Sequence, residues 1–131
     1  MEKKIGKGKE YINGKLIFEG ELSNGKKNGK GKEYEYEYGH LYFEGEYLNG
    51  EKNGKGKEYD FGGELVFEGE YLKGKRWNGM GREYKDKILI FEGDIKKGKR
   101  NGKGKEYNDN GKLIFEGKYL NGKRWNGKGK E

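Results

Sequence analysis

The large apolar residues of this chain recur in short alternating stretches. Phe18, Gly20 and Leu22 occupy every second position of one such stretch, with Glu19 and Glu21 between them. Successive side chains of a β-strand point to opposite faces of its sheet, so this pattern predicts a strand with one apolar and one charged face. No helical periodicity of useful length appears, and alanine, a strong helix former, is absent. We therefore predict an all-β chain.

Two short motifs recur about every 24 residues, which is the mark of a repeat architecture. The tripeptide Phe-Glu-Gly begins at Phe18, Phe43, Phe67, Phe91 and Phe115. A Gly-x-Gly-[Lys/Arg]-Glu motif begins at Gly6, Gly29, Gly54, Gly79, Gly102 and Gly127. We interpret the chain, residues 1–131, as one repeat domain with a half unit at residues 1–15 and full units at about 16–40, 41–64, 65–88, 89–112 and 113–131.

Within a unit, the two motifs are predicted to form a β-hairpin. In the second unit the strand-like pieces are Phe43–Tyr47 and Gly54–Tyr59, joined by a polar segment with the turn-forming pairs Asn49-Gly50 and Asn53-Gly54. Strands lie about 4.8 Å apart, so the units would form an elongated single-layer antiparallel sheet of successive hairpins about 50–60 Å long.

The recurring aromatic and glycine residues are predicted to fix this fold. A glycine leaves room for an aromatic ring, so we expect the phenylalanines to lie over glycines of neighbouring strands. An isolated hairpin buries too little to be stable, and stability should come from stacking between units. The expected structural residues are Phe18, Gly20, Gly29, Gly31, Phe43, Gly45, Gly54, Gly56, Phe67, Gly69, Gly79, Gly81, Phe91, Gly93, Gly102, Gly104, Phe115, Gly117, Gly127 and Gly129.

The recurring segment FEGEYLNGEKNGKGKEY at residues 43–59 resembles the MORN repeat (membrane occupation and recognition nexus). The resemblance covers about the whole chain, and it implies a twisted, groove-shaped, single-layer sheet. The chain departs from the family at the second aromatic position, which is often Trp in the family and is Leu22, Tyr47, Tyr71, Ile95 and Tyr119 here. Toxin-neutralising proteins with Asn-Gly-Lys-rich repeats also look similar, but they usually carry a bulky residue at the second glycine of Gly-x-Gly.

Composition by itself would fit a disordered chain, since 29% of residues are hydrophobic and 40% are charged. The fixed spacing of the aromatic residues argues against disorder. There is no cysteine, and neither a secretory signal nor a stretch of transmembrane length appears. We expect a soluble chain in the cytoplasm, with association to a membrane surface or the cytoskeleton as the alternatives.

Catalytic chemistry finds little support. The chain has one serine, Ser23, and one histidine, His40, which rules out the usual nucleophile and zinc arrangements. Residues 20–26 fit a phosphate-loop spacing, but Lys27 stands where the magnesium-binding Ser or Thr belongs, and no helix follows. Carboxylate pairs such as Glu19 and Glu21 recur, as structural stripes do. We predict no enzyme, no cofactor and no metal.

Binding to another macromolecule is the remaining function. A formal charge of +7 and a basic row of hairpin loops suggest the candidate interaction residues Arg76, Trp77, Lys99, Arg100, Arg124 and Trp125, although each tryptophan could instead cover its own loop. We predict a non-catalytic scaffold that binds protein partners. The alternative is peripheral binding to anionic phospholipid. Nucleic acid ranks third because Glu interrupts the basic stretches, and unpaired sheet edges predict homodimers.

Overall fold

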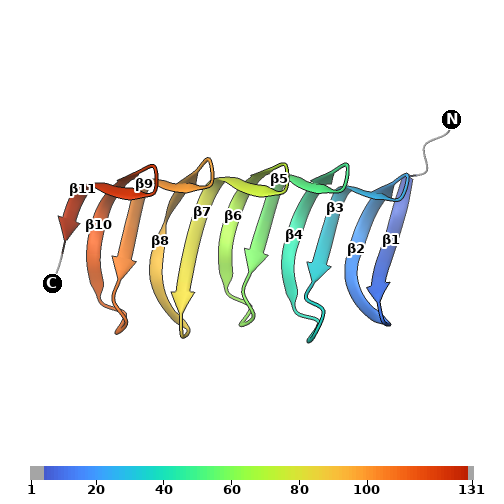
Figure 1. The fold of residues 1–131 in the computed structure, drawn as a ribbon, viewed down its shortest axis with the longest axis horizontal. Coiled ribbons are helices and arrows are strands. Elements are labelled where there is room, and N and C mark those ends of the chain that lie inside the picture. Colours follow the sequence, from blue (N-terminus) through green and yellow to red (C-terminus); the bar gives the residue numbers. More distant parts are fainter. Residues whose placement is uncertain (1–4, 130–131) are drawn as a thin grey trace.

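The computed structural model describes residues 5–129, and in this part of the chain it is an all-β structure without helices. The strands form one antiparallel sheet in which each strand pairs with its neighbours in sequence (Figure 1), which confirms the predicted fold class. No helix in the described part could span a membrane. The strands are β1 (Ile5–Ile12), β2 (Lys15–Ser23), β3 (Lys26–Tyr34), β4 (Leu41–Leu48), β5 (Glu51–Tyr59), β6 (Leu65–Leu72), β7 (Lys75–Lys85), β8 (Ile88–Lys96), β9 (Lys99–Tyr107), β10 (Leu113–Leu120) and β11 (Lys123–Gly129).

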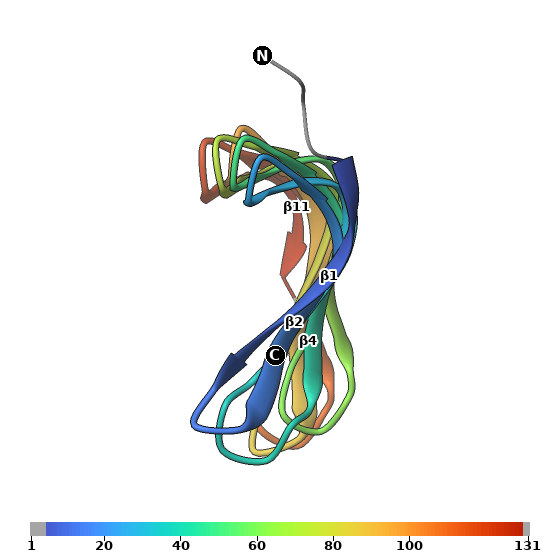
Figure 2. The same ribbon diagram turned by 90° about the vertical axis from the view of Figure 1, so that its right-hand side faces the viewer.

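The sheet is elongated, with β1 and β11 at opposite ends (Figure 1). Seen end-on, the strands are bent (Figure 2). The turns that join β2 to β3, β4 to β5, β6 to β7, β8 to β9 and β10 to β11 lie at one edge of the sheet and curl toward one side of it. We call this edge the turn edge. Backbone hydrogen bonds hold the turns after β4, β6, β8 and β10 to the preceding unit, as where Gly50 N donates to Lys27 O and Gly74 N donates to Lys52 O. Neighbouring units are therefore connected through their turns as well as through strand pairing.

Tight two-residue turns explain the register of the hairpins. Asn49 and Gly50 have φ values of 49° and 88°, the left-handed backbone that a type I′ turn requires and that Asn and Gly tolerate. The second predicted turn pair, Asn53-Gly54, lies inside β5, so that part of the prediction is wrong. Asn53 Oδ1 instead accepts a hydrogen bond of 3.5 Å from Lys73 N in the next turn. Asn28, Asn78 and Asn101 make the same kind of bond at 3.1–3.2 Å.

A row of glycines crosses the sheet from strand to strand. Gly45 pairs with Gly31 on one side and Gly56 on the other, and glycines are matched in this way along the sheet. A methyl group added to Gly45 would lie 2.6 Å from Gly56 Cα, and one added to Gly56 would lie 2.7 Å from the Phe43 ring. These contacts confirm that phenylalanine rings lie over glycines of neighbouring strands. The row lets backbones and rings approach more closely than any side chain would permit.

The core is a column of aromatic rings on one face of the sheet, which we call the aromatic face. Phe43 and Phe67 are fully buried, although the sheet is a single layer. Tyr71 lies between these two rings, with centroids 5.1 Å from Phe43 and 5.3 Å from Phe67, in edge-to-face geometry. Each such tyrosine joins two units, since it packs on its own phenylalanine and on that of the preceding unit. Ile95 replaces the tyrosine in the fourth unit and is packed against both groups of buried aromatic residues.

Candidate functional site

The predicted interaction residues Arg76, Arg100 and Arg124 fold back onto the aromatic face. The Arg76 guanidinium carbon lies 5.3 Å from the centroid of Phe67, and its Nε and Nη2 donate to Glu58 at 3.1 and 2.6 Å. Arg100 lies 3.9 Å from the Phe91 centroid and donates to Glu83, and Arg124 lies 4.6 Å from the Phe115 centroid and donates to Glu106. Each arginine thus covers a buried ring and pairs with a glutamate.

Lys27 and Lys52 occupy the equivalent position in the first two units. Lys52 Nζ lies 4.3 Å from the Phe43 centroid and 3.8 Å from Glu33 Oε2, and Lys27 Nζ lies 3.4 Å from Glu33 Oε1. The sequence alone did not predict a role for these lysines. The sequence does mark these lysines by their position in the repeat. In every full unit a basic residue precedes the asparagine before Gly-x-Gly, and in two units a tryptophan stands between the basic residue and the asparagine.

The glutamates of these clusters are stabilised as carboxylates. Burial raises the pKa of Glu58, but hydrogen bonds from Arg76 and from the Tyr71 hydroxyl (2.7 Å) outweigh it and leave the pKa below its usual value. Glu106 has a lowered pKa for the same reason, with Arg124 as the main cause. Burial, together with the contact with Glu58, raises the pKa of Tyr71. These clusters therefore stabilise the fold with Glu58 and Glu106 ionised.

We expect stability to fall in acid through these glutamates. A carboxyl whose pKa is lowered on folding contributes stability above its unfolded pKa, about 4.5, and loses it as pH falls through the folded value. Urea midpoints measured between pH 7 and pH 2 should therefore decline below about pH 4.5. Glu58→Gln should be less stable than the wild type at pH 7 and closer to it at pH 2. Glu64→Gln, in an exposed loop, is the control, and an equal deficit of Glu58→Gln at both pH values would contradict the prediction.

Tyr47 and Tyr71 occupy equivalent positions but differ in their hydrogen bonds. Tyr71 donates to Glu58, whereas the buried Tyr47 hydroxyl lies against Glu33 without a hydrogen bond of normal geometry, and Glu33 accepts from Tyr42 at 2.5 Å. We expect Tyr71→Phe to lower the free energy of unfolding by about 1–2 kcal/mol, and Tyr47→Phe to leave it unchanged or raise it by up to about 1 kcal/mol. Urea denaturation of both variants tests this difference, and equal losses would contradict it.

The remaining predicted residues lie near the turn edge. Trp77 is half-buried in β7 and Trp125 is 64% exposed in β11, so the structure places both in strands and not in loops. Each is the extra residue at a register shift, as between the pairs Tyr71–Arg76 and Glu70–Asn78. Lys99 is exposed at the first position of β9. The three arginines thus lie on the aromatic face, whereas Lys99 and Trp125 are exposed near the turn edge, and the role of the six residues as a binding surface stays a prediction.

The turn edge itself is strongly basic. Its exposed side chains include Leu48, Leu72 and Leu120, which are 39–51% exposed, and the acidic Glu51. All the other charged residues that flank or form its turns are exposed lysines. They are Lys26, Lys73, Lys75, Lys96, Lys97, Lys99 and Lys123. A basic row interspersed with leucine has the chemistry of an anionic surface contact.

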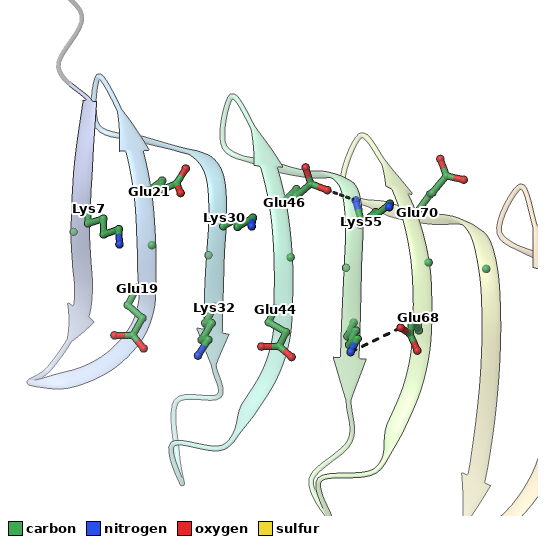
Figure 3. Close-up of a pocket in the computed structure, with 18 of the residues that line it drawn as sticks. Lys7, Glu19, Glu21, Lys30, Lys32, Glu44, Glu46, Lys55, Glu68 and Glu70 are labelled. Atoms are coloured by element: carbon green, nitrogen blue, oxygen red, sulfur yellow. Dashed lines mark hydrogen bonds and ion pairs between the residues drawn. The ribbon is translucent and has the colours of Figure 1, made fainter.

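The face opposite the aromatic column carries a shallow trough of about 1630 Å³ over β1–β7. Its floor is the glycine row, and charged side chains stand on both sides of that row (Figure 3). We call this surface the charged trough. Its volume exceeds the roughly 300–1,000 Å³ of small-molecule pockets, so a segment of a macromolecule suits it better.

Charge alternates from strand to strand in the trough. Lysines on one strand face glutamates on the next, as in the pairs Lys32–Glu44 and Lys57–Glu68. Within a strand both charged residues have the same sign, because they are two positions apart and share a face. From β1 to β6 the lining charges are Lys7 and Lys9, Glu19 and Glu21, Lys30 and Lys32, Glu44 and Glu46, Lys55 and Lys57, and Glu68 and Glu70.

Several of these charges interact within the chain. Lys57 Nζ lies 3.8 Å from Glu68 Oε2, and both side chains are about half exposed. Lys55 N donates to Glu46 Oε1 at 2.9 Å (Figure 3). Exposed ion pairs of this kind contribute little to stability, about 0–1 kcal/mol each. Glu19 and Glu44 also accept hydrogen bonds from the Tyr34 and Tyr59 hydroxyls, at 2.5 and 2.8 Å. The other trough side chains remain accessible to another molecule.

Neither a metal centre nor a nucleophile–base pair emerges in residues 5–129. No group of His, Asp and Glu in this range is arranged to hold a metal ion. His40 lies in the loop after β3, where its ring is tilted at 6.1 Å from Tyr38, and Ser23 ends β2 at the opposite edge. The arrangement can bind other molecules through charge and shape.

A single sheet of stacked hairpins, with an aromatic column on one face and charge on the other, defines this chain as a β-hairpin repeat solenoid. The family model of the MORN repeat matches it at residues 18–34, 43–63 and 91–112. Three segments of the chain thus match the MORN repeat, and MORN repeats are non-catalytic modules that generally mediate protein or lipid interactions. None of the curated protein sequences compared with the chain matches it.

Proposed function

We propose that this protein is a non-catalytic scaffold that binds a protein partner through the charged trough. The observation that carries the proposal is the continuous alternation of charge across six strands around a floor without side chains. The basic residues of the aromatic face are already engaged with rings and glutamates, whereas the trough charges are exposed or half-exposed. Ordered charge of this kind gives specificity and speeds association.

Cross-linking with a matched pair of variants tests the scaffold proposal. A trough variant carries Lys32→Gln, Lys55→Gln and Lys57→Gln, and an edge variant carries Lys75→Gln, Lys99→Gln and Lys123→Gln. Both lose three positive charges, so net charge is held constant between them. A scaffold that uses the trough should lose its cross-linked partners in the trough variant and retain them in the edge variant. Identical partner profiles for the wild type and both variants would refute the proposal.

A second candidate function is binding to an anionic phospholipid surface through the turn edge. The specific observation is the row of exposed lysines and leucines that lies on this one edge. Each Lys close to an anionic bilayer contributes about 1 kcal/mol of binding free energy, and the lysines of several turns can act together. Flotation with vesicles of phosphatidylcholine and phosphatidylserine tests it. Binding should fall with salt and in the edge variant but not in the trough variant, and equal binding by both variants would overturn it.

A further inference from the structure

We propose that the charged trough accommodates an α-helix of a partner protein, lying across the strands, whose charges change sign at each helical turn. This inference rests on the proposed scaffold function and names the class of partner. It starts from the spacing of the lining charges. Sign changes at every strand, which corresponds to about 4.8 Å along the sheet, and like charges recur every two strands, about 9.6 Å.

A helix matches this spacing, whereas an extended chain does not. One helical turn rises about 5.4 Å and two turns about 10.8 Å. Over the five intervals from β1 to β6, the helical pitch and the strand spacing differ by about 3 Å in total. A helix centred on the trough would therefore be out of step by about 1.5 Å at each end. Long Lys and Glu side chains span that difference. In an extended segment, side chains on one face are about 6.7 Å apart, and the mismatch accumulates with every residue pair.

The shape of the trough fits a cylinder. The glycine floor presents only backbone on this side, because the Cβ direction of Gly45 points toward the Phe43 ring on the aromatic face. Charged side chains such as Glu44 and Glu46 stand on either side of the floor (Figure 3). The lined length from β1 to β7 is about 29 Å, which corresponds to a helix of about 20 residues.

The two rows of charge also specify a sequence pattern. Both rows carry the same sign on any one strand. At every turn the helix must therefore present two residues of the opposite sign, one to each wall. Neighbouring residues of a helix are about 100° apart and can point to the two walls. The expected partner therefore carries doublets, Lys-Lys then Glu-Glu, about every 3.5 residues. This arrangement also places Lys and Glu four residues apart, which stabilises the helix itself.

Designed peptides test the pattern directly. The alternating peptide is three heptads of KKAAEEA, and the blocked peptide has the same doublet positions and composition but places the three Lys-Lys doublets before the three Glu-Glu doublets. Fluorescence anisotropy with the intact chain should give a Kd at least tenfold lower for the alternating peptide, and raising the salt concentration should weaken its binding. A difference of less than threefold between the two peptides would overturn the proposal.

A charge-swapped protein separates recognition from loss of folding. The swap variant carries Lys30→Glu, Lys32→Glu, Glu44→Lys and Glu46→Lys, so its net charge is unchanged but the order of sign along β1–β6 becomes plus, minus, minus, plus, plus, minus. A third peptide with the complementary doublet order should bind the swap variant at least tenfold more tightly than it binds the wild type. The alternating peptide should show the reverse preference. Unchanged preferences in a variant with a normal circular dichroism spectrum would overturn the proposal.

Three further outcomes distinguish this proposal from its alternatives. Light scattering could show that the wild type forms dimers that dissociate as salt is raised and that the swap variant is a monomer. That result would assign the trough to a second copy of this chain and overturn the proposal of a helical partner. If the trough variant loses its cross-linked partners while the peptides bind without discrimination, the scaffold function stands and the helical occupant is rejected. If neither partners nor peptides depend on the trough, both proposals fail.

Discussion

Phe67→Ala should lower the free energy of unfolding by about 3–5 kcal/mol, because it removes a fully buried ring from the middle of the aromatic column. The phenylalanine side chain packs edge-to-face on Tyr71 and lies under the Arg76 guanidinium. Its loss removes one of the two rings on which Tyr71 packs and the ring beneath Arg76. The side chains that remain cannot close the gap easily, since the core of a single-layer sheet has no second layer that could move in.

Urea denaturation followed by circular dichroism and tryptophan fluorescence measures this effect. Because units contact only their neighbours, a weakened central unit should also divide the array, and the two signals should no longer coincide. Phe61→Ala is the control, since Phe61 is 74% exposed in the loop after β5 and its loss should change stability by no more than about 0.5 kcal/mol. A cost below about 1 kcal/mol for Phe67→Ala would show that the column does not hold the units together.

Gly45→Ala should lower the free energy of unfolding by about 2–4 kcal/mol. The added methyl group would lie 2.5 Å from Lys55 O and 2.6 Å from Gly56 Cα. Both atoms belong to the backbone of the paired strand, so no side-chain rotation can relieve the contact. The strands must separate locally, which weakens the pairing of β4 with β5 and displaces the Phe43 ring.

Gly6→Ala is the matched control, since Gly6 is also a strand glycine but an added methyl group there has nothing within 4 Å. We expect Gly6→Ala to change stability by no more than about 0.5 kcal/mol. Thermal and urea unfolding of the two variants compare a close backbone approach with an open one. Similar midpoints for the two variants would mean that the glycine row is not required for close strand approach.

The secondary structure follows from local signals in the sequence. Alternation around Phe18 and the Asn49-Gly50 pair predict a strand and a tight turn, and both are confirmed, in β2 and in the turn between β4 and β5. Asn53-Gly54 carries the same signal and yet lies within a strand. The turn before it had already reversed the chain, and Gly54, with φ of 104°, takes up a register shift in the pairing of β4 with β5. A local signal cannot indicate which of two adjacent candidates the strand pairing will use.

The position of the basic residues could not be predicted from local pattern. Arg76 follows a turn and reads as a loop residue, but its guanidinium lies over Phe67 and pairs with Glu58, 18 residues earlier. That contact depends on the curl of the turn edge and on the register between neighbouring hairpins. The assignment of Arg76, Arg100 and Arg124 to a binding surface stays a prediction. The charged trough, on the opposite face, is the surface whose charges are more accessible.

Local sequence is enough to specify a stack of hairpins with aromatic residues over glycines, because strand alternation, turn chemistry and a repeat period are properties of neighbouring residues. Tertiary structure alone decided how the charges are arranged. The lysines of the Gly-x-Gly motif and the glutamates of the Phe-Glu-Gly motif alternate along one trough only because the strand register aligns the glycines across the sheet. That alignment and the bend of the strands depend on backbone contacts between units, and they create the surface on which the proposed function rests.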